Sequence, residues 1–208
     1  MKSEEINSLF KNLNKVIKNP KSDLKYKNKF TLLVSVVLSA QCTDVNVNNV
    51  TKNIYPKYNK PEHFVKLGRK KIEKLIKSIG LFRNKAKSVY LLSKQLIEKH
   101  NGKVPKNFDD LYALPGVGRK TASVVLNEGF GLPTIAVDTH VFRVSNRTGL
   151  APGKNPDEVQ KNLYKIVPKK YLKKAGHTIL LHGRYTCKAR TPSCKTCVII
   201  KYCKYNNK

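Results

Sequence analysis

The sequence is short of acidic residues and of long apolar runs, and both shortages exclude classes of protein. Thirteen Asp and Glu stand against 42 Lys and Arg, which gives a net charge of +29. Such an excess indicates a polyanionic partner, above all nucleic acid, although a lysine-rich composition can also reflect an AT-rich genome. The longest apolar run, Phe30 to Ala40, is too short to cross a bilayer. Met1 to Pro20 has helical apolar spacing rather than the unbroken core of a secretory signal. We therefore expect a soluble, intracellular protein with no membrane contact.

Alternating strand patterns are also missing, apart from one short extended candidate at Pro133 to Val137. Apolar residues recur with helical spacing along almost the whole chain, which predicts an all-α fold. The Asn101-Gly102 pair is a typical helix C-cap, and later helices are expected at 138–148, 156–167 and 170–186. No repeat or low-complexity linker interrupts the chain, so two domains would pack closely rather than hang on a tether.

The most informative stretch is LPGVGRKTA, from Leu114 to Ala122. It predicts the end of a short helix, a tight turn and the start of a second helix. Pro115 cannot continue a helix, and Gly116 and Gly118 permit positive φ and close backbone approach. Such a turn presents backbone N–H groups at a helix N-terminus, an arrangement that binds anions. Lys120 falls in the first turn of the second helix, where the dipole disfavours an ammonium and favours a free amine.

Two nucleotide-binding motifs do not fit this stretch. A phosphate-binding loop needs glycine where Arg119 and Leu114 stand, and a dinucleotide fingerprint needs a third glycine where Thr121 stands. An ordinary helix-turn-helix connection with an exposed lysine remains an open alternative at this point.

Four of the five cysteines crowd the C-terminal segment as C-x6-C-x2-C-x5-C: Cys187, Cys194, Cys197 and Cys203. Four thiolates from a short segment suit a tetrahedral metal or an iron–sulfur cluster. Disulfides need an oxidising compartment, and structural zinc usually takes two short C-x2–4-C pairs, of which only one is present. The spacing favours a cluster and leaves zinc open. Cys42, at an apolar helix end, is expected to be a buried small apolar residue.

Asp138 opens a predicted helix just after a Gly-Leu-Pro turn. Aspartate is a preferred N-cap, and capping is the commonest reason for it at this position. A capping role is compatible with chemistry, because the helix dipole and amides keep the carboxylate ionised. An ionised acid and a neutral amine form a useful pair for attack at a carbon that develops positive charge.

Taken together, these residues resemble the endonuclease III DNA glycosylases of the helix-hairpin-helix superfamily. The resemblance runs essentially end to end. It is carried by Leu38–Gln41 with Thr43-Asp44, Ile79–Leu81, the hairpin 114–122, Thr134–Arg143, His182–Tyr185 and the 6-2-5 cysteine spacing.

This resemblance implies an all-α fold of two helical domains flanking a DNA-binding cleft. Residues 22–132 would form a six-helix barrel domain with the helix-hairpin-helix, and 1–21 with 133–208 an iron–sulfur cluster domain. It also implies that the four C-terminal cysteines hold a [4Fe–4S] cluster. Lys120 and Asp138 would meet across the cleft.

The chemistry implied by the family is excision of an oxidised pyrimidine followed by strand cleavage. Lys120 would be the nucleophile that attacks C1′, with Asp138 as its acidic partner, and a Schiff base would then undergo β-elimination. Gln41 and Leu81 match wedge residues that fill the space left by the extruded base, although core packing is the alternative for Leu81. The DNA contacts implied by position are Gln41, Leu81, Gly116, Val117, Gly118, Arg119, His140 and Arg143.

The expected partner is double-stranded DNA with oxidised pyrimidines or abasic sites, bound by a monomer in the bacterial cytoplasm at the nucleoid. One alternative is an adenine mismatch glycosylase of the same superfamily, which would need glutamate where Val37 stands and commonly lacks the hairpin lysine. Another is a non-catalytic helix-hairpin-helix DNA-binding protein, which would require neither Lys120 nor Asp138.

Overall fold

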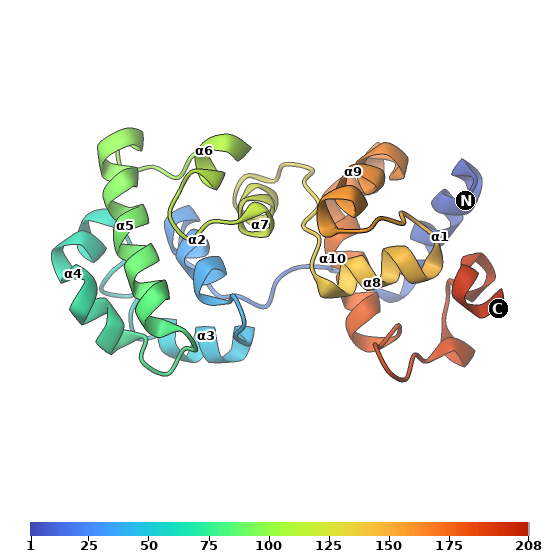
Figure 1. Ribbon diagram of the computed structural model, residues 1–208, viewed down its shortest axis with the longest axis horizontal. Coiled ribbons are helices and arrows are strands. Elements are labelled where there is room, and N and C mark those ends of the chain that lie inside the picture. Colours follow the sequence, from blue (N-terminus) through green and yellow to red (C-terminus); the bar gives the residue numbers. More distant parts are fainter. Residues whose placement is uncertain (208) are drawn as a thin grey trace. The chain divides into compact units, whose positions relative to one another are not determined.

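The computed structural model describes residues 1–207, and this range holds helices and no strand (Figure 1). The all-α prediction is therefore confirmed. The chain divides into two compact units: unit 1 comprises Met1–Ser22 with Gly131–Lys208, and unit 2 comprises Asp23–Phe130. Ser22, Gly131 and Leu132, which we expected in the barrel domain, thus belong to unit 1. None of the described helices is long and apolar enough to span a bilayer.

Unit 2 is built around helix α2, in which every residue from Phe30 to Leu38 is buried. The apolar run is therefore a buried helix, as predicted. Helices α3, α5 and α7 pack against α2, and α4, which is kinked at Gly68 (φ +71°), packs along α5. The helices of unit 2 are α2 (Lys29–Leu38), α3 (Asp44–Thr51), α4 (Pro61–Leu75), α5 (Phe82–His100), α6 (Phe108–Tyr112) and α7 (Arg119–Phe130).

Polar side chains define several helix ends in unit 2. Asn28 and Thr43 cap α2 and α3 by accepting the amide of the third helical residue, at 2.9 and 3.2 Å. At the C-terminal end of α5, Asn101 is left-handed (φ +50°), and the amide of Gly102 donates to the Leu96 carbonyl at 2.9 Å. This confirms the predicted C-cap, because a left-handed residue with a bond back to the last turn is how helices commonly end.

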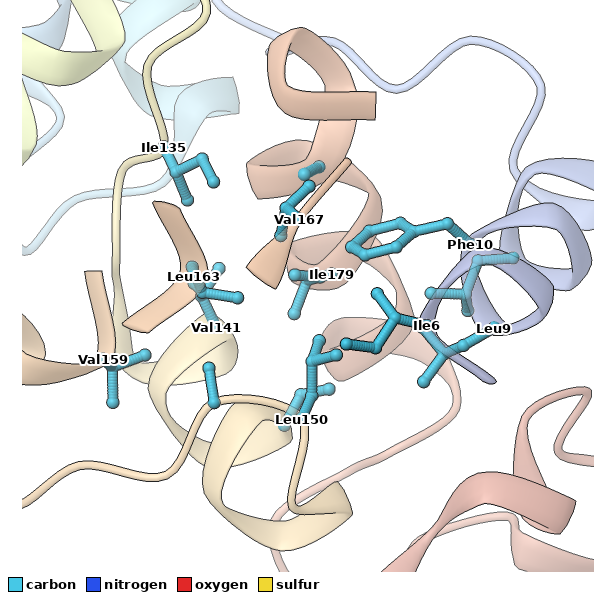
Figure 2. Packing of buried hydrophobic residues seen from close by; sticks show 14 of the residues in the cluster. Ile6, Leu9, Phe10, Ile135, Val141, Leu150, Val159, Leu163, Val167 and Ile179 are labelled. Atoms are coloured by element: carbon cyan, nitrogen blue, oxygen red, sulfur yellow. The ribbon is translucent and has the colours of Figure 1, made fainter. Parts of the chain in front are cut away.

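Unit 1 joins the two ends of the sequence in one apolar core (Figure 2). Helix α1 contributes Ile6, Leu9 and Phe10, which lie among side chains such as Val141 and Ile179 from the C-terminal half. Helices α8 and α10 pack on each other. The elements of this unit are α1 (Ser3–Val16), α8 (Thr139–Thr148), α9 (Pro156–Ile166), α10 (Lys169–Tyr185) and the 3-10 turns η1 (Cys194–Thr196), η2 (Ile200–Tyr202) and η3 (Lys204–Asn207).

The segment Pro133–Val137, the extended candidate, forms no strand. The amide of Ile135 donates to the Tyr164 hydroxyl at 3.0 Å, and the Gln160 side chain donates to the Ile135 carbonyl at 2.6 Å. Because side chains of α9 satisfy these backbone groups, the segment needs no partner strand.

Candidate active site, DNA interface and cysteine cluster

The turn between α6 and α7 has the predicted helix-hairpin-helix geometry. Gly116 is left-handed (φ +79°), and the bond from the Ala122 amide to the Gly118 carbonyl (2.9 Å) starts α7. A Cβ atom on Gly116 would lie 2.5 Å from the Cβ of Ser88 on α5. Glycine is thus required at position 116 by both its φ and its surroundings.

The backbone amides of this turn are not all available to a phosphate. The Val117 amide, expected to help grip the anion, donates instead to the Leu114 carbonyl at 3.0 Å, and its side chain is buried. Within residues 1–207, the amides of Gly116 and Gly118 make no backbone hydrogen bond. The space beside Gly118 is open, since an added Cβ would meet no atom within 4 Å. These two amides are therefore the candidate phosphate donors.

Lys120 and Arg119 begin α7 in different surroundings. Lys120 is exposed on the first turn. The Arg119 guanidinium lies over the rings of Phe108 and Tyr112, 5.7 and 5.6 Å from their centroids. Cation–π stacking thus links Arg119 to α6, a role that sequence reasoning missed, and its contact with DNA stays a prediction.

The two glycines of the turn provide a matched test of these roles. Gly116→Ala is expected to lower the stability of the protein by about 2 kcal/mol, because the new Cβ meets Ser88 and a positive φ is unfavourable. Gly118→Ala is expected to leave the melting temperature nearly unchanged and to weaken duplex binding by obstructing the phosphate. Thermal melts and fluorescence anisotropy measure both effects. Equal losses of stability in the two variants would contradict this assignment.

Asp138 is the N-cap of α8, as predicted. Its Oδ1 atom accepts the amides of His140 and Val141 at 2.9 and 2.8 Å, and the residue is half-buried. The other oxygen, Oδ2, makes no hydrogen bond to any residue in the described range. The carboxylate therefore caps the helix through one oxygen, and its catalytic role stays a prediction.

His140 and Arg143, both predicted DNA contacts, are half-buried and bonded within unit 1. Arg143 donates from Nη2 to the Gly183 carbonyl (2.8 Å) and from Nε to the Cys187 carbonyl (3.1 Å). Its Nη2 also lies 3.2 Å from Nδ1 of His140. Arg143 thus ties α8, which Asp138 caps, to the backbone at the first cysteine of the cluster. No sequence pattern indicates this role, and DNA contact by either residue stays a prediction.

Gln41 and Leu81, the predicted wedges, share an unusual backbone conformation. Their φ angles are +52° and +58°, and both side chains are exposed, Leu81 by 57%. A left-handed conformation costs a residue other than glycine about 1–2 kcal/mol, so the surrounding structure must hold these turns. The exposure of Leu81 rules out the core-packing alternative.

The four C-terminal cysteines line one small pocket. Cys187 and Cys203 are buried, Cys194 and Cys197 are half-buried, and all are free thiols. Burial raises the pKa of the Cys197 thiol, and the other three cysteines raise it further because each thiolate disfavours the next. Four thiolates lining one pocket repel one another, and a positively charged centre bound among them would offset this repulsion. The donor set, four cysteines from one segment, fits an iron–sulfur cluster by its chemistry. Within residues 1–207, however, no three His, Cys, Asp or Glu side chains are already arranged to hold a metal ion.

Two basic side chains lie against these sulfurs. Arg147 places Nη1 3.7 Å from the Cys187 Sγ and donates to the carbonyls of Lys188 and Ala189 at 2.7 and 3.0 Å. Nε2 of His182 lies 3.7 Å from the Cys197 Sγ, and burial lowers the pKa of His182 to about 4. Arg147 thus holds the start of the loop that carries the cysteines. The His182 imidazole is neutral and brings no positive charge to the sulfurs.

Cys42 is not buried as expected. It is half-exposed, and its Sγ accepts a hydrogen bond from the Asn46 side chain at 3.3 Å. The left-handed turn at Gln41 ends the apolar helix just before it and brings Cys42 to the surface.

A sequence model of the HhH-GPD superfamily base excision DNA repair proteins matches residues 34–169, which include the hairpin and Asp138. The chain is therefore a helix-hairpin-helix DNA repair protein. Endonuclease III of Rickettsia conorii is 52% identical over 205 residues, which cover 99% of this chain and 98% of that protein. Endonuclease III of Escherichia coli K12 is 50% identical over 190 residues, covering 91% and 90% of the two chains. The chain belongs to the endonuclease III family.

A solved structure agrees with this assignment. A trapped covalent intermediate of endonuclease III with DNA superposes with a TM-score of 0.93 at 43% identity, over 100% of this chain and 98% of that one. As a member of the family, the protein is a bifunctional base excision repair glycosylase and abasic-site lyase. Its C-terminal cysteines are those typical of a [4Fe–4S] cluster.

The cysteine assignment predicts the metal content of the purified protein. It is expected to be brown and to contain about four iron and four acid-labile sulfide per chain. Cys203→Ser should lose most of the iron, whereas Cys42→Ser, a matched thiol remote in sequence from the other four, should retain it. Metal analysis and the visible absorption spectrum measure this. Stoichiometric zinc without iron would refute the assignment.

Proposed function

We propose that this protein excises oxidised pyrimidines from double-stranded DNA and cleaves the resulting abasic strand by β-elimination. The observation that carries the proposal is the exposed Lys120 on the first turn of α7, directly after a turn in which the Gly116 and Gly118 amides have no backbone partner within residues 1–207. An amine beside a phosphate-binding turn is suited to attack the sugar attached to that phosphate. A related endonuclease III has been trapped as a covalent intermediate with DNA, which supports a nucleophilic mechanism.

In the proposed mechanism, the neutral Lys120 amine forms a bond to C1′ as the glycosidic bond breaks, and the base leaves with the proton that the attacking nitrogen loses. The sugar ring opens to a protonated Schiff base between Lys120 and C1′. Loss of a C2′ proton then expels the 3′ phosphate, and water releases the lysine. Asp138 supplies negative charge for the oxocarbenium-like transition state or assists deprotonation of the amine.

DNA binding follows from separate features of the chain. The amides of Gly116 and Gly118 hold a backbone phosphate, which fixes the register of the strand. Extruding a base costs about a few kcal/mol, and we assign Gln41 and Leu81 to the vacated space. When bound, the iron–sulfur cluster supplies a structural centre for the cysteine loop, whose exposed basic residues Lys188 and Arg190 contact phosphates.

The remaining parts of the proposal concern organisation. Unit 2 serves as the helix-hairpin-helix barrel domain, and unit 1 as the cluster domain. The protein acts as a monomer in the bacterial cytoplasm, at the nucleoid. Its net charge of +29 favours such a location, because chromosomal DNA is the dominant polyanion there.

A panel of labelled duplexes tests the proposal. A thymine glycol paired with adenine should be excised and its strand cut to a fragment ending in a 3′ unsaturated aldehyde. An adenine–guanine mispair and an undamaged duplex should remain intact. Excision of the mispaired adenine would instead indicate a mismatch glycosylase, and binding without any cleavage would indicate a non-catalytic protein.

A further inference from the structure

The turns that carry Gln41 and Leu81 lie against each other in unit 2. A Cβ atom on Gly80 would be only 3.9 Å from the carbonyl oxygen of Gln41. The side chain of Asn46, on the first turn of α3, donates to the Ser78 carbonyl at 3.2 Å. Two segments far apart in sequence therefore form one continuous surface feature.

A buried lysine makes the second connection between these turns. Lys85 is only 6% exposed and lies on the first turn of α5, where its amide donates to the Leu81 carbonyl at 3.0 Å. Its Nζ atom donates to the carbonyl of Leu38 at 2.9 Å, across 47 residues of sequence. Lys85 thus joins the start of the helix after Leu81 to the end of the helix before Gln41.

The Leu38 carbonyl has a physical need for this donor. It belongs to the last residue of α2, where carbonyls lack helical partners and the dipole is negative. The Cys42 amide, which would satisfy it if the helix continued, donates instead to Ser39 at 3.0 Å. An ammonium group at this position satisfies the carbonyl in a way that no apolar side chain can.

Burial of a lysine side chain is unfavourable unless its charged group is paired or hydrogen-bonded. Burial lowers the pKa of Lys85, with an opposing contribution from the nearby Cys42. The proposed reaction assigns Lys85 no chemical step.

We infer that Lys85 is a positioning residue that, together with Asn46, locks the two left-handed turns into one rigid element, so that Gln41 and Leu81 enter the duplex together. This inference rests on the proposed wedge role of those two residues. In this interpretation, the hydrogen bonds donated by Lys85 and Asn46 offset the unfavourable free energy of the two left-handed conformations.

Lys85→Met tests the inference because it keeps the length of the side chain and removes the donor. The substrates are a duplex with thymine glycol opposite adenine and a single-stranded oligonucleotide with a preformed abasic site, in which no base must be extruded. Single-turnover cleavage of the duplex is expected to fall about tenfold or more, and cleavage of the single strand to change less than about twofold. Lys85→Arg, which keeps a charged donor, should recover part of the duplex rate.

A fluorescent readout follows the insertion step itself. 2-Aminopurine placed opposite an uncleavable abasic analogue should brighten less on binding Lys85→Met than on binding the unchanged protein. A merely structural role would lower the rates on both cleavable substrates together. Equal loss on duplex and single strand would therefore overturn the inference.

Matched variants separate this inference from the proposed function. Lys87→Met removes an exposed lysine of the same helix and should keep the ratio of duplex to single-strand rates. If Gln41→Ala and Leu81→Ala keep full duplex activity, the wedge role is wrong and the inference falls with it. If Gln41→Ala and Leu81→Ala lose duplex activity while Lys85→Met keeps it, the wedge role stands and only the inference is wrong. Should Lys85→Met fail to fold, the variant Asn46→Ala tests the inference instead. A lower ratio of duplex to single-strand rates in that variant supports the inference, and an unchanged ratio overturns it.

Discussion

Lys120→Ala is expected to lower strand cleavage at an abasic site by about 10³-fold or more, while the affinity for an uncleavable abasic duplex stays nearly the same. The side chain is exposed on the first turn of α7, so its removal disturbs no packing. The amine supplies the covalent step, and no other group in the proposal can form the Schiff base. Single-turnover cleavage and fluorescence anisotropy measure the two quantities.

Lys120→Arg is the control for charge. Its guanidinium keeps the positive charge that attracts DNA but is not deprotonated in proteins, so it cannot act as the nucleophile. We expect this variant to bind as the unchanged protein does and to be as inactive as Lys120→Ala. Cleavage by Lys120→Arg at an undiminished rate would show that position 120 contributes only charge.

Asp138→Asn is expected to slow release of the damaged base by about 10²–10⁴-fold with little change in stability. Asparagine can still accept the amides of His140 and Val141, so the N-cap of α8 persists while the negative charge is lost. Base release under single-turnover conditions and a thermal melt measure the rate and the stability.

Asp138→Ala separates the cap from the chemistry. It removes both, so it should be as slow as Asp138→Asn and less stable by about 1 kcal/mol. If Asp138→Asn releases base normally and only Asp138→Ala is impaired, the residue serves α8 as a cap and has no part in the reaction.

Local sequence patterns predicted the features whose physics is local. Glycines and a proline at fixed spacing specify the hairpin, because Gly116 needs a positive φ and Pro115 cannot continue a helix. The cap at Asp138 and the helix end at Asn101 follow from side chains that bond to neighbouring backbone groups. The four cysteines line one cavity because three of them stand on or beside short turns of one segment.

Contacts between distant segments were beyond the reach of such patterns. Nothing near Lys85 in the sequence indicates that its ammonium is buried against a carbonyl 47 residues away. The family resemblance implied a DNA contact for Arg143 but not the bond that its guanidinium donates to the Gly183 backbone, 40 residues further on. Cys42 was misplaced for a related reason, since hydropathy does not show that Gln41 turns left-handed. In each case the three-dimensional neighbour, and not the residue type, decides the role.

The most direct test of the account is to locate the covalent bond to DNA. The cluster-loaded protein is incubated with an abasic duplex and borohydride, which reduces the Schiff base to a stable amine, and the protein is then digested for mass spectrometry. The predicted result is one adduct, on the side-chain nitrogen of Lys120. An adduct confined to another residue, or no adduct from active protein, would contradict the assignment of this lysine as the nucleophile.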